Sequence, residues 1–448
     1  MALNVAQVVS QIKANVGKTL RADRILKTCS LLNHKFRKRI LDPVTTLHVF
    51  LLQILHGNIA CSGMTHLAGI TFSATAYCKA RTCLPLLLFE ILLEQVIDSL
   101  LPAVEHADRW HGHRTWLLDG STFSMPDTKE LQKEFGQPGA QKKGCGFPVA
   151  HLLALFHACT GVLQKVIVAP MRTHDMKQAA LMHPEMQEND LLMADRGFSS
   201  YAHLALLIQR KMHGLLRCHQ KQIVDFTTRR THTGRRKPVK GLPRSRWLKR
   251  LGKDDQQVEY VKPTTRPKWM SVEDYASLAE TLVVRELRYT IAQPGRRTRV
   301  ITLVTTLLDP VLYPATDLAE LYGQRWGVEV HLRELKTTMK MEVLHCKTVK
   351  GVKKELMMFV LAYTLVRMVM LEASRRQNQP VDRISFVDVL RWLRTAEAGT
   401  PLPKFVLNPY RPKRYEPRVV KRRPKPFKLM TKPRADLRKA LSEQQLGA

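Results

Sequence analysis

The sequence predicts a mixed α/β fold, in which a sheet flanked by helices follows a helical N-terminal region and is interrupted by a β-rich insertion. Three observations predict it. Apolar residues recur at helical spacing near the N-terminus, short apolar runs alternate with helical stretches from about residue 106, and 44% of the 448 residues are hydrophobic. That apolar share is enough for a sizeable core and is typical of a folded chain.

Changes of pattern along the chain divide it into five expected regions. They are a helical N-terminal domain (1–105), the first part of the core (106–220), a β-rich basic insertion (221–304), the second part of the core (305–376) and a C-terminal region with a basic tail (377–448). The elements expected in each region follow from the local pattern.

The N-terminal region contains a helix start and a pair of short helices. Asp42-Pro43 provides an N-cap followed by proline at the first helical position. Between residues 64 and 84, two short helical stretches flank a Gly-Ile-Thr turn at 69–71, a layout that resembles a helix-turn-helix. Helix pairs joined by a glycine-containing turn are common, so the second helix either enters a DNA groove or only packs against its neighbours.

From about residue 106 the chain alternates between strand-like and helical runs. The first run ends in Asp119-Gly120, and the next two are joined by a hairpin-type turn at 159–161. A later buried strand stops at Asp195. The predicted order is three strands, helix, strand, helix and strand, at 115–118, 151–156, 162–168, 176–183, 190–194, 201–212 and 214–218. This order predicts a mixed α/β core.

The second half of the chain begins with a basic segment and ends in a basic tail. The segment RRTHTGRRKPVKGLPRSRWLKR at 229–250 precedes two β-like runs. Two helices are expected after them, a long amphipathic one at 316–341 and a buried one at 353–375. From 404 to 439, Arg and Lys interleave with Pro and aromatic residues, which predicts an extended, poorly packed electrostatic arm.

The charge balance indicates a polyanionic partner. The chain has 72 Lys and Arg residues against 38 Asp and Glu residues, a formal net charge of +34. An excess of that size repels itself in a compact fold unless a polyanion neutralises it. Nucleic acid is therefore the first partner to consider, and an anionic membrane surface is the second.

Neither a membrane span nor a secretory signal is expected. The longest apolar stretch, at 356–371, contains Arg367 and is shorter than the roughly 20 residues that a bilayer span needs. The N-terminus lacks a basic segment followed by a long apolar core, and the eight cysteines include no CxxC pair. These features predict a soluble cytoplasmic protein with reduced thiols.

Two aspartates accompany strand-type runs. Asp119 stands at or near the end of the first predicted strand, and Asp195 directly follows the fourth. Ligands gather at the carboxyl ends of strands in α/β sheets, so these two carboxylates are expected to converge. The competing interpretation is simple turn chemistry, which is equally well supported for either residue by itself.

The predicted long helix carries a third carboxylate on a polar face. At about 100° per residue, four polar side chains fall within a sector of about 60°. They are Tyr322, Arg325, Glu329 and Lys336. The competing interpretation is a solvated stripe with an Arg325–Glu329 ion pair. Gly323 and Gly327 bracket this face at a cost of about 1 kcal/mol each in a helix interior, which close approach of a DNA backbone would explain.

Three carboxylates on a mixed sheet and a following helix are the ligands that two-metal phosphodiester chemistry requires. Two Mg²⁺ ions roughly 4 Å apart need anionic oxygen ligands, with one carboxylate shared between them. Arg and Lys beside the third carboxylate would hold phosphates. The constellation therefore predicts metal-dependent chemistry on phosphodiester bonds.

The segments around these residues carry recognisable signatures. The spacing Tyr322-x2-Arg325-x3-Glu329-x6-Lys336 is one, and LLDGSTFSMPDTKE, GCGFPVAHLLALF and MADRGFSSY are the others. The three strings are similar to the segments around the first and second Asp of IS4 family transposases, and the spacing reproduces that family's YREK signature. The resemblance spans about residues 35 to 375 and implies an RNase H-like catalytic core with a DDE triad.

The resemblance implies a role for each of these residues. The catalytic residues, which also bind two Mg²⁺ ions for which Mn²⁺ can substitute, would be Asp119, Asp195 and Glu329. The residues that contact DNA would be Tyr322, Arg325, Lys336, Arg196 and an aromatic residue of the insertion that stacks a flipped base, with Trp269 and Trp247 as candidates.

The implied function is DNA transposition. A transposase of this family binds the terminal inverted repeats of an insertion sequence, cleaves at the element ends and transfers the strands into target DNA. The expected assembly is a homodimer in a synaptic complex, associated with the nucleoid in the bacterial cytoplasm, with DNA contacts from the N-terminal domain and the insertion. Two alternatives stay open, a stand-alone RNase H-like nuclease and a non-catalytic DNA-binding regulator.

Overall fold

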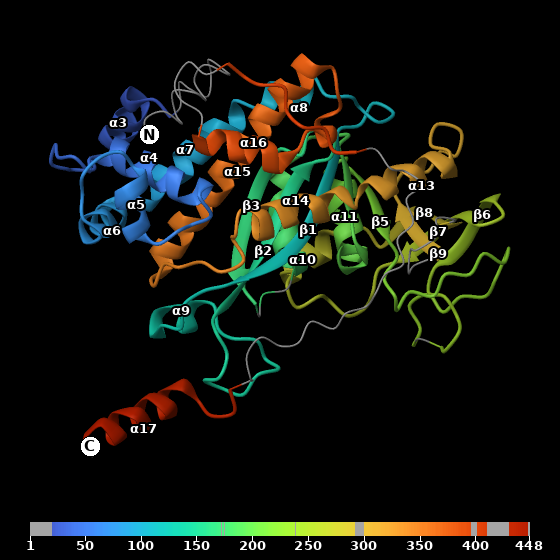
Figure 1. Ribbon diagram of the computed structural model, residues 1–448. Coiled ribbons are helices and arrows are strands. Elements are labelled where there is room, and N and C mark those ends of the chain that lie inside the picture. Colours follow the sequence, from blue (N-terminus) through green and yellow to red (C-terminus); the bar gives the residue numbers. More distant parts are fainter. Residues whose placement is uncertain are drawn as a thin grey trace.

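A large twisted sheet runs through the centre of the protein, with the N-terminal helices at one side and the strands of the insertion at the other (Figure 1). The structure, a computed structural model, describes residues 20–171, 173, 175–237, 239–291, 300–395, 401–409 and 430–446. The segment 1–19 and the middle of the expected basic tail, at 410–429, lie outside the described residues.

The N-terminal region is helical, as predicted. Its described helices are α3 (Ala22–Leu31), α4 (Pro43–Leu55), α5 (Cys61–Leu67), α6 (Ala74–Cys83), α7 (Leu86–Asp98) and α8 (Leu101–Glu105). The helix start at Asp42 is confirmed, because its carboxylate accepts a hydrogen bond from the Thr45 N–H at 2.7 Å. The expected helix pair is α5 and α6, and Ser73 caps α6 by accepting from the Ala76 N–H at 3.2 Å.

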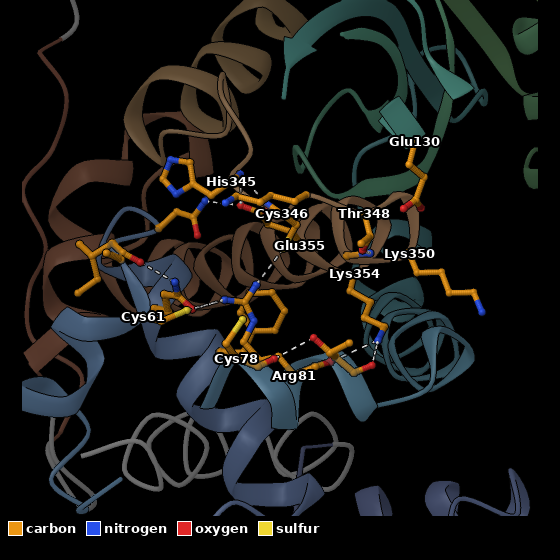
Figure 2. Close-up of a pocket in the computed structure, with 18 residues that line it drawn as sticks. Cys61, Cys78, Arg81, Glu130, His345, Cys346, Thr348, Lys350, Lys354 and Glu355 are labelled. Atoms are coloured by element: carbon orange, nitrogen blue, oxygen red, sulfur yellow. Dashed lines mark hydrogen bonds between the residues drawn. The ribbon is translucent and has the colours of Figure 1, made fainter. Parts of the chain in front are cut away.

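Residues of helix α6 and of the long helix α15 (Val349–Gln377) line a shared cavity of about 640 Å³. Figure 2 shows Arg81 at this cavity, where its guanidinium lies 3.7 Å over the Phe50 ring. Lys354 of α15 donates to the carbonyls of Arg81 and Thr82 at 3.3 and 2.9 Å, at the C-terminal end of α6, where the helix dipole favours a cation. These contacts fix α6 to the core, and a DNA contact by α6 stays a prediction.

Nine strands of the described chain form one sheet in the order β3-β2-β1-β4-β5-β9-β8-β7-β6. They are β1 (Thr115–Ser124), β2 (Val149–His157), β3 (Leu163–Pro170), β4 (Leu191–Ala194), β5 (His213–Arg217), β6 (Arg246–Gly252), β7 (Asp255–Val261), β8 (Thr281–Thr290) and β9 (Val300–Thr305). β1, β2 and β3 are antiparallel neighbours, whereas β1, β4 and β5 are parallel. With α9 (Lys129–Glu134), α10 (Asp175–Met182) and α11 (Tyr201–Gln209), they form the predicted mixed α/β, RNase H-like core.

The first strand is longer than expected, so Asp119 lies within it and not at its end. Pairing of β1 with β2 continues to Ser124 opposite Val149, whereas pairing with the shorter β4 stops at Leu118 opposite Ala194. Asp119 is therefore the first residue beyond the parallel pairing. Asp119 lies at the edge of β1 that β4 leaves unpaired. This position depends on where β4 ends, and the sequence around Asp119 does not reveal that.

The strands of the insertion extend the core sheet. β9 pairs antiparallel with β5, with Leu215 opposite Thr305, and β8, β7 and β6 follow by antiparallel pairing. Helix α12 (Val272–Ser277) lies between β7 and β8. The insertion is β-rich, as predicted, and its sheet is continuous with that of the core.

The single long helix expected at 316–341 is wrong, because this segment is divided into three. The pieces are α13 (Ala315–Gln324), α14 (Gly327–Arg333) and the π-helical turn η3 (Glu334–Thr338). At the first joint the N–H of Arg325 bonds only three residues back, to the Tyr322 carbonyl at 3.1 Å. At η3 the N–H of Met339 reaches five residues back, to Glu334 at 2.9 Å. An apolar period of 3.6 fits each piece and does not reveal the joints.

The two glycines flank the first joint, and neither lies in the interior of one continuous helix. A Cβ added at Gly323 would meet no described atom within 4 Å, and one at Gly327 would meet Leu117 Cδ1 at an ordinary 3.7 Å. The cost assumed for a helix interior does not apply at these positions. The inference of a closely approaching DNA backbone therefore loses its support.

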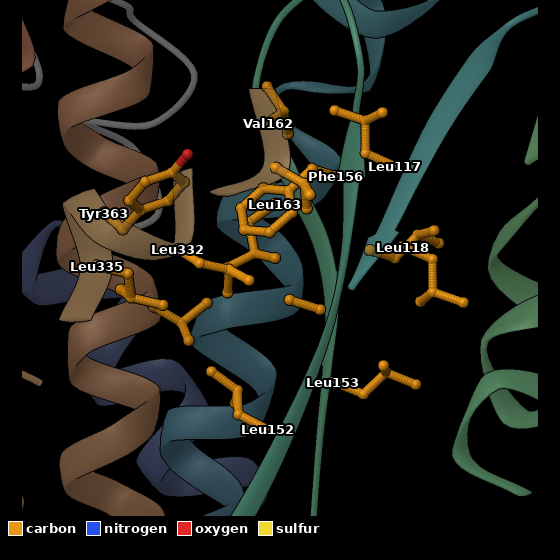
Figure 3. Packing of buried hydrophobic residues seen from close by; sticks show 14 of the residues in the cluster. Leu117, Leu118, Leu152, Leu153, Phe156, Val162, Leu163, Leu332, Leu335 and Tyr363 are labelled. Atoms are coloured by element: carbon orange, nitrogen blue, oxygen red, sulfur yellow. The ribbon is translucent and has the colours of Figure 1, made fainter. Parts of the chain in front are cut away.

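Helix α15 forms the centre of the core and confirms the predicted buried helix. Of the described helices, it has the length and apolar character of a membrane span, yet 89% of its most apolar window is buried within the protein. Figure 3 shows Tyr363 of α15 beside Leu332 and Leu335, with Phe156 of β2 opposite. The apolar surface of α15 thus packs against the sheet and against the segment that carries Glu329.

The C-terminal region contains α16 (Phe386–Thr395) and α17 (Arg434–Leu446). Helix α17 begins within the tail that was expected to be extended at 404–439, so that expectation is wrong for its last part. Ala, Leu, Lys, Glu and Gln dominate α17 and are strong helix formers. Arg434 anchors it by pairing with Asp127 at 2.9 Å and lying 3.9 Å over the Phe147 ring.

Candidate active site

A cleft at the end of β4 contains two of the predicted acidic residues. Asp119 lies on the open edge of β1, and Asp195 directly follows β4 at the start of the 3₁₀ turn η2 (Arg196–Phe198). Both line a cleft of about 320 Å³. Its described lining residues are Asp119, Gly120, Ser121, Thr122, His151, Asp175, Asp195, Gly197 and Phe198. The two aspartates thus converge where the parallel strands end.

The pKa of Asp119 depends in part on the charges of the other two predicted catalytic carboxylates, Asp195 and Glu329. Its Oδ1 accepts a hydrogen bond from the Gly120 N–H at 2.8 Å. Burial raises the pKa of Asp119 above its ordinary value, and the carboxylates of Asp195 and Glu329 raise it further, against the opposing effect of Gly120 and Arg325. Carboxylates close enough to perturb one another in this way define a site that favours a cation.

Arg325 is the cation that the chain itself places there. Its Nη1 lies 3.8 Å from Asp119 Oδ2, its Nη2 lies 3.3 Å from Glu329 Oε1, and its side chain is 7% exposed. Within the described chain, the buried Nε and Nη1 atoms of Arg325 have no hydrogen-bond partner. Unused donors on a buried guanidinium are costly unless a ligand meets them, and a phosphate oxygen is the acceptor that suits them.

Glu329 stands at the outer edge of the site. It lies on α14 with a side chain that is 49% exposed, and it is not among the described residues that line the cleft. In the part of the chain that the structure describes, no three His, Cys, Asp or Glu side chains are close enough to hold a metal ion together. Asp119, Asp195 and Glu329 nonetheless offer the oxygen ligands that Mg²⁺ prefers, with Arg325 between two of them.

Tyr322 differs from the expectation that it shares an exposed polar face with Glu329. It is 3% exposed, and its hydroxyl donates to the Ala194 carbonyl at 3.3 Å. Burial raises the pKa of the Tyr322 phenol above its ordinary value, and the neighbouring Asp195 carboxylate also raises it. Tyr322 lies on α13 and connects it to the end of β4, whereas Glu329 lies beyond the break, on α14.

The other predicted DNA-contacting residues lie in different settings. Lys336 is half-buried within η3, and its side chain makes no hydrogen bond or ion pair with any described residue. Arg196 is exposed directly after Asp195. Trp269 is half-buried against the core just before α12, and Trp247 lies on β6 with an indole N–H that has no acceptor among the described residues. Their roles toward DNA stay predictions.

The site also contains residues that sequence reasoning missed. His151 and Asp175 line the same cleft. His151 lies within the segment GCGFPVAHLLALF, but the likeness of that segment assigns it no role. Arg367 of α15 donates to Glu334 and, at 2.7 Å, to His331 Nδ1, which fixes the segment between Glu329 and Lys336. The only signal for Arg367 in the sequence is a charge that interrupts an apolar stretch.

A buried pair of neutral histidines supports the turn after Asp195. His203 Nδ1 donates to the Phe198 carbonyl at 2.7 Å, so its Nε2 accepts a hydrogen bond from His183 Nε2 at 2.9 Å. Burial lowers the pKa of His183 to about 2 and the pKa of His203 to about 4. The pair therefore remains neutral at physiological pH.

We expect the fold to lose stability as the pH falls below about 6.5, the ordinary pKa of histidine in the unfolded chain. Because the folded pKa values are lowered, the contribution of the pair is complete above that pH, and protons bind to the unfolded state first. For His203 the loss is about 2 kcal/mol by about pH 5. Urea unfolding at a series of pH values measures this loss of stability. The His203→Gln variant should lose less stability than the wild type as the pH falls. An equal loss in that variant contradicts the assignment of His203 as a buried neutral histidine.

The strand order of the core is that of an RNase H-like fold, with an acidic cleft beyond the end of β4. The family model described as "Transposase DDE domain" matches residues 110–365, more than half of the chain. The chain belongs to the DDE transposases, in the IS4 family.

The chain is similar to three other transposases. The transposase InsG of insertion sequence element IS4 from Escherichia coli K12 is 25% identical over 335 residues, which are 70% of this chain and 69% of that protein. The putative transposase InsZ from the same strain is 30% identical over 104 residues, 23% of this chain and 35% of that one. A synaptic complex of the piggyBac transposase with hairpin DNA has a TM-score of 0.45 at 9% identity, over 88% of this chain and 77% of that chain.

Proposed function

We propose that this transposase binds the terminal inverted repeats of an insertion sequence, cleaves at the element ends and transfers the strands into target DNA by cut-and-paste transposition. The observation that carries this proposal is the cleft lined by Asp119 and Asp195, beside the buried Arg325, which pairs with Asp119 and Glu329 and has unused donors. Such a site accepts divalent cations together with a phosphodiester.

Asp119, Asp195 and Glu329 are the proposed catalytic residues and the ligands of two Mg²⁺ ions, for which Mn²⁺ can substitute. When bound, such ions activate the attacking oxygen and stabilise the leaving oxygen of an in-line displacement. Arg325 exchanges its contacts with Asp119 and Glu329 for a phosphate of the DNA end, which satisfies its unused N–H groups. Tyr322, held on the Ala194 carbonyl, keeps Arg325 and Asp195 in a fixed relation.

The remaining DNA contacts are proposed for surfaces around the cleft. Arg196 and Lys336 contact the transposon end, and Trp269 stacks a base that leaves the duplex. The helical N-terminal domain and the basic insertion contact DNA farther from the cleavage site. The working assembly is a homodimer that holds two ends, in the nucleoid of the bacterial cytoplasm.

Strand transfer separates this proposal from its alternatives. With Mg²⁺ and a target plasmid, DNA ends that already carry a free 3′-OH should become joined to the target. A stand-alone RNase H-like nuclease would cut DNA without joining, and a non-catalytic regulator would bind DNA without either product. Joined products therefore support the proposal, and their absence from an otherwise cleaving protein contradicts it.

We expect Arg325→Ala and Lys336→Ala to weaken binding to the transposon end by about tenfold to a hundredfold, because each removes charge-assisted contacts to phosphate. Binding to a random duplex should fall less, since the exposed basic surface is unchanged. Gel-shift titrations in Ca²⁺ on both duplexes measure the two losses. Lys211→Ala is the control, because Lys211 is 74% exposed and lies before β5, at the other end of the parallel strands. Equal losses on both duplexes speak against the assigned role.

A further inference from the structure

The proposed active-site cleft contains a basic side chain whose role is unassigned. Its described lining has three aspartates, Asp119, Asp175 and Asp195, and His151 is the one basic residue among them. A polyanionic strand that enters such a cleft meets mostly negative charge. The position and charge state of His151 therefore bear directly on how DNA is held there.

The imidazole of His151 is held in one orientation. Its Nδ1 lies 2.8 Å from Asp175 Oδ1, and the two side chains are 24% and 44% exposed. Asp175 begins α10, which packs against both β2 and the turn η2 after Asp195. Because Nδ1 is engaged by Asp175, the other ring nitrogen, Nε2, remains available, and no residue in the described part of the chain bonds to it.

His151 approaches the cleft from the face of the sheet opposite to the face of Asp119. His151 pairs with Thr122 across β1 and β2, and directly opposed residues share a face. Thr122 is three residues after Asp119, so the two side chains of β1 project to opposite faces. The cleft is open to both faces because β4 ends at Ala194, which leaves the edge of β1 free.

Asp175 also favours the protonated form of the imidazole. Its hydrogen bond and its negative charge raise the pKa of His151 above the ordinary value, against the smaller opposing effect of burial. A protonated imidazole fixed through Nδ1 presents an N–H donor and a positive charge at Nε2. These are the properties that bind a phosphate oxygen.

We infer that His151, oriented by Asp175, binds a phosphate of the DNA strand beside the scissile phosphate. This inference rests on the proposed function of the cleft. The phosphate between the carboxylates lies on the side of Asp119 and α14, so the imidazole on the other face meets a neighbouring phosphate of the same strand. His151 is a substrate-binding residue in this scheme, and Asp175 is a positioning residue that acts through it.

The experiment uses the full chain and transposon-end duplexes that each carry one methylphosphonate near the cleavage site. Neutralising the contacted phosphate should slow single-turnover cleavage by the wild type about tenfold or more. The same modification should cause no further loss in His151→Asn, whose rate on unmodified DNA is already lowered by a similar factor. Asp175→Asn should fall between the two proteins. Binding of the same duplexes in Ca²⁺ measures the effect of each methylphosphonate position, the methylphosphonate profile, without requiring cleavage.

The matched control is His111→Asn, because His111 also pairs with an aspartate, Asp317 at 3.2 Å, but precedes β1 at the opposite end of the sheet. It should retain the wild-type methylphosphonate profile. A His151→Asn profile identical to that of the wild type at every position would overturn the inference. If the wild type cleaves no transposon end at all, the proposed function itself fails and the inference with it; cleavage with an unchanged profile overturns only the inference.

Discussion

Asp119→Asn should reduce cleavage of the transposon end by about a thousandfold or more while DNA binding is retained. The substitution removes an anionic oxygen from the proposed metal site, where Lewis-acid stabilisation contributes several kcal/mol. The amide keeps the size of the side chain and can still accept the Gly120 hydrogen bond. Asp195→Asn and Glu329→Gln should have effects of the same order.

Single-turnover cleavage in Mg²⁺ and gel shifts in Ca²⁺ measure the two effects separately. Asp317→Asn is the matched control, because Asp317 is an ion-paired aspartate remote from the cleft and should leave cleavage unchanged. The thermal stability of Asp119→Asn should be unchanged or raised, since the pKa of Asp119 is raised and its charged form is disfavoured in the fold. Cleavage within a few fold of the wild type would remove Asp119 from the catalytic set.

Arg367→Met should destabilise the fold by about 3–5 kcal/mol, because it leaves the Glu334 carboxylate buried without its partner. Arg367 is 2% exposed and donates to Glu334, to His331 Nδ1 at 2.7 Å and to the Tyr363 hydroxyl at 2.9 Å. Urea unfolding measures the loss. The double variant Arg367→Met with Glu334→Leu removes both charges and should recover most of it.

The same substitution should weaken binding to the transposon end more than binding to a random duplex. Glu334 is the first residue of η3, and Lys336 lies two residues later in that turn. Releasing η3 from α15 therefore displaces the proposed phosphate contact. A single variant as stable as the wild type, or a double variant no more stable than the single one, would contradict this assignment.

Local patterns were sufficient to predict most of the elements of the core. Alternation of strand-like and helical runs predicted the strands and helices that surround Asp119 and Asp195, and the hairpin turn at Gly161 has a φ of +65°. A Cβ at Gly161 would lie 2.9 Å from His331 Cε1, so this glycine is also required by packing against α14. The turn was predictable from sequence, whereas its long-range contact was not.

The joints between α13, α14 and η3 were not predictable from the local sequence. The same is true of features that depend on pairing between segments far apart in the chain. A 3.6-residue period cannot distinguish one long helix from α13, α14 and η3 laid end to end, and this hid the break between Tyr322 and Glu329. The length of β1 depends on its pairing with β2, and the joining of β9 to β5 depends on residues far apart in the chain. His151 and Asp175 meet only through the fold.

Binding of Mn²⁺ to the protein–DNA-end complex, followed by electron paramagnetic resonance, is the most direct measurement of whether Asp119, Asp195 and Glu329 hold metal ions. The wild type should bind two ions in the presence of the end duplex, and Asp119→Asn, Asp195→Asn and Glu329→Gln should each lose at least one. Two ions retained with unchanged affinity in all three variants would contradict the assignment of these carboxylates as metal ligands.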